Sequence, residues 1–201
     1  NIPYELVTFN INDSCGSSIQ HAQELSQIIR DYKLANGVEK INIVAHSKGG
    51  LDARVYLANN PLDDSVANLI MIGTPNNGSP MADRDYQDDP CKPAVFDLLT
   101  NSSSLDVPNN ANTKYYTIAG KWVTEFIPWM WTFIDRNCID FSYWYAYQTD
   151  GRAYLDGPDD GIVPTWSAQP NEFIPLGNTD NCHTDLLNKE SYDIASRILK
   201  E

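Results

Sequence analysis

Short apolar segments alternate with amphipathic segments along most of this chain. Apolar runs that are typical of buried strands lie at residues 4–9, 40–45, 66–72, 114–119 and 172–176. Apolar residues at helical spacing predict helices at residues 18–36, 48–58 and 185–199. Strands separated by helices favour an α/β fold, in which helices cover both faces of a mostly parallel sheet.

The composition supports one domain and excludes several classes of function. The 201 residues are expected to form a single domain, residues 1–201, and 42% hydrophobic residues argue against disorder. Because the net charge is −13, neither a nucleic-acid partner nor a basic membrane-binding face is expected. The longest apolar run, residues 126–134, contains Pro128 and is too short to span a bilayer, so no transmembrane segment is expected.

The four cysteines, Cys15, Cys91, Cys138 and Cys182, are widely spaced along the chain. None forms a C-x-x-C pair, so a zinc site is not expected. An even number of cysteines in an acidic chain favours two disulfides in a secreted or extracytoplasmic protein, and the alternative is a cytosolic protein with reduced thiols. Of the three connectivities, we consider the pairing of Cys91 with Cys138, which would join the ends of the middle region.

A strand-to-helix turn carries the strongest chemical signal. Residues 41–50 read Ile-Asn-Ile-Val-Ala-His-Ser-Lys-Gly-Gly, an apolar strand that runs into Ser47 and then into a helix. A serine on such a sharp turn is strained and needs small residues two positions before and after it, and Ala45 and Gly49 meet this need. The turn raises the Ser47 hydroxyl above the sheet and places the backbone N–H of Lys48 where it can stabilise an oxyanion. The pattern favours Ser47 as a nucleophile over an ordinary turn serine.

At these residues the sequence resembles the α/β-hydrolase superfamily, and within it the bacterial-type lipases and esterases. The resemblance rests on residues 45–54, Ala-His-Ser-Lys-Gly-Gly-Leu-Asp-Ala-Arg. Residues 72–79, Ile-Gly-Thr-Pro-Asn-Asn-Gly-Ser, are similar to the segment that follows the next strand in the family. The resemblance implies a triad in the chain order nucleophile, acid, base, and it implies no cofactor.

His183 is the predicted general base. Of the 3 histidines, His21 lies on the first predicted helix and is expected at the surface. His46 directly precedes Ser47, and its side chain is expected to point away from the hydroxyl. His183 lies between the last predicted strand and the last predicted helix, which is where the family places its base.

Asp160 is the predicted acid. The run Asp-Asp-Gly-Ile-Val-Pro at residues 159–164 resembles the lipase pattern around the triad aspartate, and that pattern matches Asp160. A carboxylate there would accept the Nδ1 proton of His183 and fix its tautomer. Asp159 is one residue away and stays as an alternative, and so does a plain Asp-Gly turn.

Lys48 and Asp185 are charged residues close in sequence to the predicted nucleophile and base. A cation in the first helical turn opposes the helix dipole, so the Lys48 side chain is expected to pair with an acid. Asp185 stands where some related lipases carry a structural calcium ligand, and Asp135 or Asp140 would be its partner. We favour the alternative, in which Asp185 lies in the first turn of the last helix, and no metal site is expected.

Two long stretches interrupt the alternation and are predicted to be lid-like insertions. Residues 76–112 are rich in Asn, Asp, Ser and Pro, and residues 121–158 are crowded with aromatic side chains. The aromatic stretch is expected to form a lid or cap over an apolar acyl pocket, and the alternative is a small satellite core under a long loop. An apolar cleft would suit acyl esters better than sugars or charged peptides.

One unit of the family's sheet is not found in the sequence. In this family the second oxyanion N–H comes from a loop after an earlier strand. Residues 4–37 instead resemble the strand and helix that come just before the strand leading into Ser47. An empty central slot would leave buried backbone groups unpaired, so upstream residues or a second chain are expected to complete the sheet. The alternative is a rearranged sheet with a different oxyanion donor.

These observations and the resemblance together predict a serine carboxylic-ester hydrolase, a lipase or esterase, that acts on apolar acyl esters of small molecules or lipids. A catalytically incomplete hydrolase-fold module for binding or structure is one alternative. A hydrolase of phospholipid, polyester or amide substrates is another.

Overall fold

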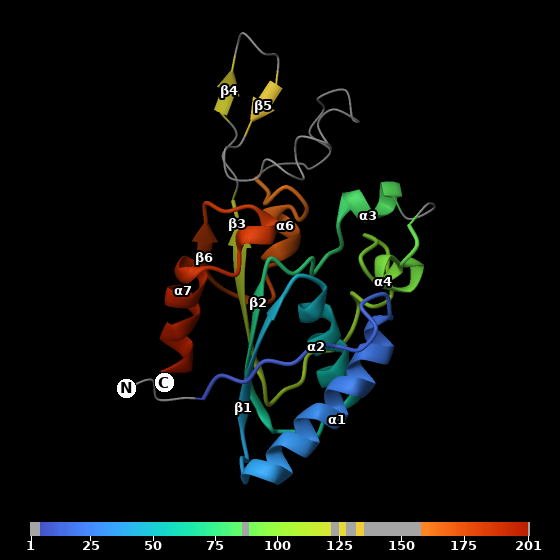
Figure 1. Ribbon diagram of the computed structural model, residues 1–201, viewed down its shortest axis with the longest axis vertical. Helices are drawn as coiled ribbons and strands as arrows, with labels where there is room; N and C mark the ends of the chain where they lie inside the picture. Colours follow the sequence, from blue (N-terminus) through green and yellow to red (C-terminus); the bar gives the residue numbers. More distant parts are fainter. Residues whose placement is uncertain (1–4, 86–88, 122–124, 128–131, 135–157, 201) are drawn as a thin grey trace.

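The computed structural model describes residues 5–85, 89–121, 125–127, 132–134 and 158–200. The main strands are β1 (Ile41–His46), β2 (Val66–Ile72), β3 (Lys114–Gly120) and β6 (Ile174–Thr179). They form a parallel four-stranded sheet in the order β1-β2-β3-β6 (Figure 1). Two short strands, β4 (Glu125–Ile127) and β5 (Thr132–Ile134), pair with each other in an antiparallel ladder.

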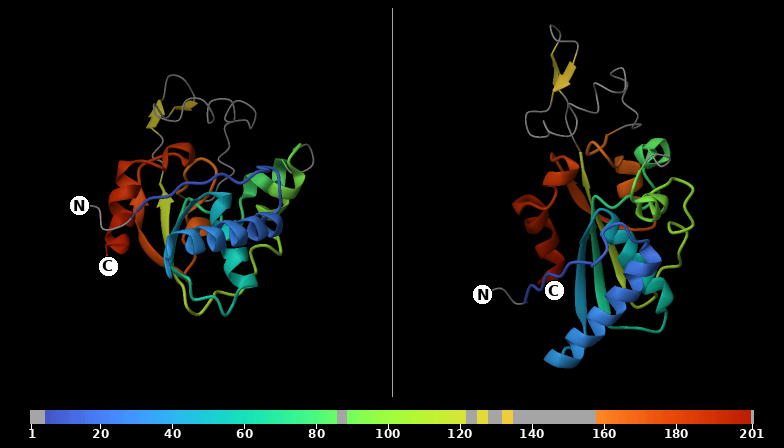
Figure 2. Two further views of the ribbon diagram at one scale, coloured as in Figure 1. Left: turned by 60° about the horizontal axis from the view of Figure 1, so that its bottom comes forward. Right: turned by 45° about the vertical axis from the view of Figure 1, so that its right-hand side comes forward.

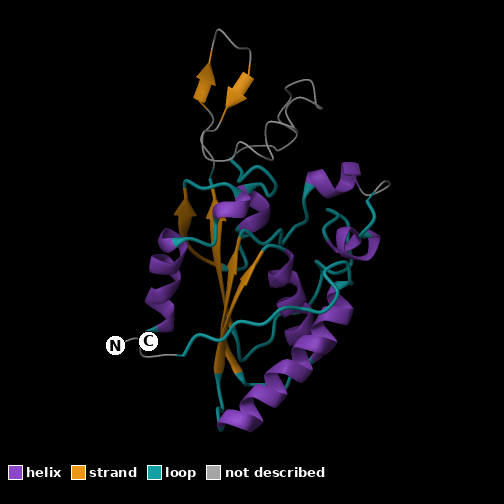
Figure 3. Ribbon diagram, viewed as in Figure 1, coloured by secondary structure: helices purple, strands orange, loops and turns teal. Residues whose placement is uncertain are grey.

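Three longer helices lie against this sheet: α1 (Ser18–Asn36), α2 (Lys48–Asn59) and α7 (Lys189–Leu199). Shorter elements are α3 (Pro80–Asp85), α4 (Lys92–Asp97), α6 (Thr165–Ala168) and the 3₁₀ turn η1 (His183–Asp185). Helices α1 and α2 lie on one side of the sheet and α7 lies on the other, as the two views of Figure 2 and the colouring of Figure 3 show. The predicted α/β class is therefore confirmed.

Strand β2 shows why the sheet needs helices on both faces. Side chains alternate across a strand, so Leu69 and Met71 face one core, while Ile70 and Ile72 face the other. The first core contains apolar residues of α1 and α2, and the second contains Leu186 and residues of α7. All four β2 side chains are at most 3% exposed, so both faces of the sheet exclude water.

Helix α1 begins and ends at the residues that the sequence predicts. Ser17 is the N-cap and forms a capping box with Gln20, and Gly37 ends the helix in the left-handed conformation with φ 65°. The prediction that His21 on this helix lies at the surface is wrong, because its side chain is buried between α1 and α2, with the residue 5% exposed. Helical spacing alone did not show how far the packed face of α1 extends.

The segment before α1 differs from the prediction. Residues 5–10 form no strand, and Leu6 is 74% and Phe9 48% exposed. A strand is stabilised by pairing with a neighbour as well as by its own apolar residues, and this segment pairs with no strand of the described sheet. In the same sheet β1 is an edge strand, and its Val44 is 42% exposed.

The stretch 76–112 contains local structure of its own, since α3 and α4 lie within it. The aromatic lid predicted for residues 121–158 falls mostly outside the described residues. Within the described ranges, no helix combines the length and the apolar character that a membrane crossing requires.

The disulfide of Cys91 differs from the pairing considered in the sequence analysis. Cys91 is bonded to Cys15 across a sequence separation of 76, so the pairing of Cys91 with Cys138 is wrong. Cys138 itself lies outside the described residues. The disulfide joins the loop before α1 to the start of α4, two segments whose proximity only the tertiary fold establishes.

Candidate active site

Ser47 lies at the turn between β1 and α2, as predicted. Its φ is 54° and its ψ is −135°, and among the described residues it is the one non-glycine residue with a positive φ. Its backbone N–H donates to the carbonyl of Ile72 at the end of β2 (2.9 Å), which fixes the turn against the sheet. Its side chain does not cap α2, so the hydroxyl is available for other partners. Strain of this kind at a single residue is characteristic of functional sites.

The small residues around Ser47 have unequal roles. A Cβ atom at Gly49 would lie 4.0 Å from the Cβ of Ala45, which is an ordinary contact. A Cβ atom at Gly50 would lie 2.1 Å from Oγ1 of Thr74. The close approach that requires glycine is therefore at Gly50, where α2 packs against the segment after β2.

The structure brings the three predicted residues into one hydrogen-bonded chain. His183 Nε2 lies 2.8 Å from Ser47 Oγ, and His183 Nδ1 lies 2.8 Å from Asp160 Oδ2. The backbone N–H of His183 also donates to the carbonyl of Asp160 (2.8 Å). Since an ionised carboxylate only accepts, Nδ1 carries the proton, and Nε2 is then free to accept from the serine hydroxyl.

Asp160, and not Asp159, reaches His183. The Asp160 side chain is 0% exposed, and its Oδ1 accepts from the backbone N–H groups of Ile162 (3.0 Å) and Val163 (2.7 Å). The tight turn after Asp160 thus holds one carboxylate oxygen and leaves the other for His183. Asp159 is less buried, and its Oδ1 accepts from the N–H of Gly161 (2.7 Å).

Glycine at the end of β2 makes room for the Asp160–His183 pair. Gly73 has a φ of 57°, and a Cβ there would lie 2.4 Å from Leu186 Cδ1 and 3.3 Å from His183 Nδ1. Both the backbone conformation and the space therefore favour glycine at this position.

His46 contacts the candidate base, which sequence reasoning missed. Its Nε2–H donates to the carbonyl of His183 (2.9 Å), and the two imidazole rings lie 4.7 Å apart. Burial lowers the pKa of His46, and the nearby His183 lowers it further, so the neutral ring is favoured. The sequence held no signal for this contact, because the residues are 137 positions apart.

The two sequence motifs of the resemblance meet through Arg54. Its guanidinium donates to the carbonyl and to Oδ1 of Asn76 (3.3 Å each) and to the carbonyl of Leu105 (2.9 Å). Ser79, at the end of the second motif, donates its hydroxyl to the carbonyl of Ile162 (2.6 Å) in the acid turn. The segment after β2 therefore connects α2 to the turn that holds Asp160.

Lys48 follows Ser47 as the first residue of α2. Its backbone N–H belongs to the first turn, where the helix supplies no carbonyl partner. The predicted ion pair of its side chain is confirmed, with Nζ 2.7 Å from Asp52 Oδ1. Asp185 lies in η1 and not in the last helix, Asp135 and Asp140 are not described, and the described part of the chain holds no cluster of three metal-ligating side chains.

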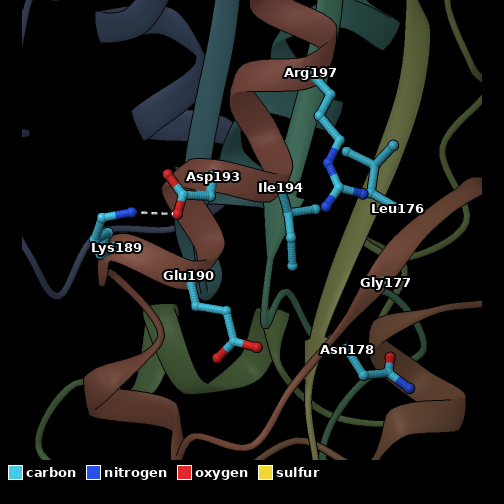
Figure 4. A pocket seen from close by; sticks show the side chains of 8 residues that line it. All are labelled: Leu176, Gly177, Asn178, Lys189, Glu190, Asp193, Ile194 and Arg197. Carbon is cyan, nitrogen blue, oxygen red and sulfur yellow. Dashed lines mark hydrogen bonds and ion pairs between the residues drawn. The ribbon is translucent and has the colours of Figure 1, made fainter.

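A separate pocket lies between β6 and α7 (Figure 4). Its lining includes Leu176 and Asn178 on β6 and Ile194 on α7, together with the ion pair of Lys189 and Asp193. The triad residues contribute nothing to this lining.

Asp159 leads to a prediction about stability and pH. Burial raises its pKa to about 6, with a further contribution from the charge of Asp160. An acid with a raised pKa in the folded state destabilises the fold as pH rises towards that pKa, and the cost is constant above it. The free energy of unfolding of Asp159→Asn should therefore exceed that of the wild type by about 1 kcal/mol at pH 8, and by less at pH 4.5. The figure of about 1 kcal/mol allows for partial solvent screening of the carboxylate.

Urea unfolding of both proteins at the two pH values measures this difference. The exposed Asp180→Asn controls for the loss of one negative charge. A difference between Asp159→Asn and wild type that is the same at both pH values would contradict the prediction.

Comparisons with known proteins agree with the fold described above. A family model described as "Alpha/beta hydrolase of unknown function (DUF915)" matches residues 2–122, more than half of the chain. The chain belongs to this α/β-hydrolase family. The hydrolase is 22% identical to the mature Bacillus licheniformis lipase BlEst2, with a TM-score of 0.69 over 92% of this chain and 75% of that one. Its similarity to the metagenomic carboxyl esterase MGS0156 has a TM-score of 0.59 and 19% identity, over 94% of this chain and 59% of that one.

Sequence relatives of the hydrolase include two named triacylglycerol lipases. Triacylglycerol lipase 2 of Saccharomyces cerevisiae is 28% identical in an alignment 195 residues long, gaps included, that covers 86% of this chain and 55% of the yeast protein. The triacylglycerol lipase of Pseudarthrobacter phenanthrenivorans is 38% identical over 61 residues, which cover 30% of this chain and 18% of that protein. The hydrolase chain thus spans about half or less of the length of these relatives.

Proposed function

We propose that this α/β hydrolase is a serine carboxylic-ester hydrolase that acts on apolar acyl esters through a Ser47–His183–Asp160 triad. The observation that carries the proposal is the hydrogen-bonded chain from Ser47 Oγ through the His183 ring to Asp160, with 2.8 Å at each link. The relatives and structural neighbours named lipase and esterase support the same class of reaction.

In the proposed reaction, Ser47 Oγ attacks the ester carbonyl carbon, while His183 Nε2 takes the hydroxyl proton. Asp160 accepts from Nδ1 and stabilises the imidazolium that forms. The backbone N–H of Lys48 donates to the oxyanion of the tetrahedral intermediate. His183 then returns the proton to the leaving alkoxide, and water hydrolyses the acyl-enzyme by the same steps.

The described sheet leaves room for a second oxyanion donor. β1 is an edge strand, so a further strand from an upstream segment or a second chain would pair with it, cover Val44 and supply the donor loop. The disulfide between Cys15 and Cys91 supports export to an oxidising compartment as part of the same proposal. The aromatic residues between 121 and 158 support an apolar acyl group.

A fluorophosphonate probe tests the proposed function directly. Ser47 Oγ would form a bond to phosphorus as fluoride leaves, and peptide mapping by mass spectrometry should place the adduct on Ser47. A panel of p-nitrophenyl esters of increasing acyl length would then show the substrate range. A native protein that neither takes up the probe nor hydrolyses any ester of the panel would support the binding-module alternative.

A further inference from the structure

A buried ionic cluster lies behind the proposed oxyanion donor. It consists of Lys48 and Asp52 on α2, Ser18 and His21 on α1, and Asp97 on α4, and we call it the elbow cluster. The side chains of Lys48, Asp52, His21 and Asp97 are 15%, 9%, 6% and 4% exposed. Ionisable groups with so little access to water require paired partners, and the cluster provides them.

The ammonium group of Lys48 is held from three helices. Nζ lies 2.7 Å from Asp52 Oδ1, 3.2 Å from Ser18 Oγ and 3.6 Å from Asp97 Oδ2. These three oxygens come from α2, α1 and α4. Together they fix the end of a flexible side chain that otherwise has many rotamers.

The other members connect the cluster to the surrounding backbone. His21 Nδ1 lies 2.8 Å from Asp52 Oδ2, and His21 Nε2 lies 2.7 Å from the carbonyl of Asp13. Asp97 Oδ2 accepts from the backbone N–H of Ser18 (2.5 Å) at the start of α1. The disulfide between Cys15 and Cys91 joins the same two segments covalently, since Asp13 and Cys15 lie in the loop before α1 and Cys91 is the N-cap of α4.

The cluster holds the side chain of Lys48, the residue whose backbone N–H is the proposed oxyanion donor. Ser47 has a strained backbone, and α2 begins immediately after it, so the direction of the Lys48 N–H depends on how that residue is held. A lysine in the first turn of a helix is unfavourable in itself, and its buried partners offset that cost. These partners come from α1, α2 and α4, and none of them belongs to the triad.

We infer that the Lys48 side chain, held by the elbow cluster, is a positioning residue for the oxyanion N–H of Lys48. This inference rests on the proposed function and extends it. A supporting residue of this kind keeps a donor within the narrow range of positions that stabilises the transition state. Its loss should lower kcat and leave KM nearly unchanged, because the donor acts on the transition state more than on the bound ester.

Lys48→Met tests this inference, because it keeps an unbranched side chain as far as Cε and the backbone N–H, and it removes the ammonium group. We expect kcat to fall about 10-fold to 100-fold with KM within about twofold, since small displacements of catalytic groups have effects of this size. The same fall is expected for the rate of fluorophosphonate labelling. The double variant Lys48→Met/Asp52→Asn removes both charges of the closest pair; it should recover thermal stability and still show the low kcat.

Lys189→Met is the matched control. It breaks an ion pair of the same i, i+4 spacing on α7 (Figure 4). Because the Lys189 side chain is 85% exposed, kcat and KM should not change. A wild-type kcat in Lys48→Met or in the double variant would overturn the inference, and so would a change confined to KM. In either case the activity of the wild-type protein would still support the proposed function. A wild-type protein without esterase activity or labelling would instead contradict the proposed function itself.

Discussion

Replacing Ser47 with alanine is expected to lower kcat for p-nitrophenyl ester hydrolysis by roughly 10⁴-fold to 10⁶-fold, because the nucleophile acts as a unit with its base and acid. Ser47 Oγ lies 2.8 Å from His183 Nε2 and caps no helix, so its loss removes the attacking atom without removing a structural hydrogen bond of α2. Fluorophosphonate labelling should be lost as well. The melting temperature should change little, because alanine and serine tolerate the φ of 54° about equally poorly.

The control for this variant is Ser103→Ala, which removes an exposed hydroxyl far from Ser47 in sequence. It should retain wild-type kcat and full labelling. Labelling or ester turnover that survived in purified Ser47→Ala at wild-type rates would show that another residue is the nucleophile.

The parts of the site that could be predicted from sequence depend on local geometry. The turn at Ser47 needs an apolar strand, small neighbours and a helix in immediate succession, and all of these lie within ten consecutive residues. The extent of α1, residues 18–36, is predictable for the same reason, because helical spacing is a local pattern. Asp160 and His183 could be proposed only through the resemblance, because 23 positions separate them.

The parts that sequence missed depend on contacts across the fold. The disulfide partner of Cys91 lies 76 positions away, and spacing alone does not rank the three possible pairings. His21 is buried because α1 packs on α2, and nothing in the helical pattern distinguishes a buried imidazole at its edge from an exposed one. The apolar residues 5–9 have strand-like composition, but composition does not supply the neighbour that a strand must pair with.

Replacing Asp160 with asparagine should lower kcat by about 10⁴-fold, and the geometry of its turn gives the reason. The backbone N–H groups of Ile162 and Val163 both donate to Oδ1, so the amide oxygen of an asparagine would occupy that position. Its NH₂ group would then face His183 Nδ1 in place of Oδ2, and Nδ1 would have to accept. The ring would carry its proton on Nε2, where it could no longer take the proton of Ser47, and a wrong tautomer has an effect of this size in a Ser-His-Asp triad.

Asp159→Asn makes the same chemical change one residue away and separates the two candidate acids. Asp159 Oδ1 accepts from the N–H of Gly161, an interaction that asparagine can keep, and its carboxylate does not contact His183. Its kcat at pH 8 should stay within about twofold of wild type, while KM values for both variants should stay close to the wild-type value, since neither acid is expected to touch the ester. Steady-state kinetics on one p-nitrophenyl ester would settle the assignment: a large loss in Asp159→Asn with near-normal turnover in Asp160→Asn would transfer the role to Asp159. A loss confined to Asp160→Asn would mean that the hydrogen bonds within the turn, and not the sequence pair Asp-Asp, select which carboxylate orients the base.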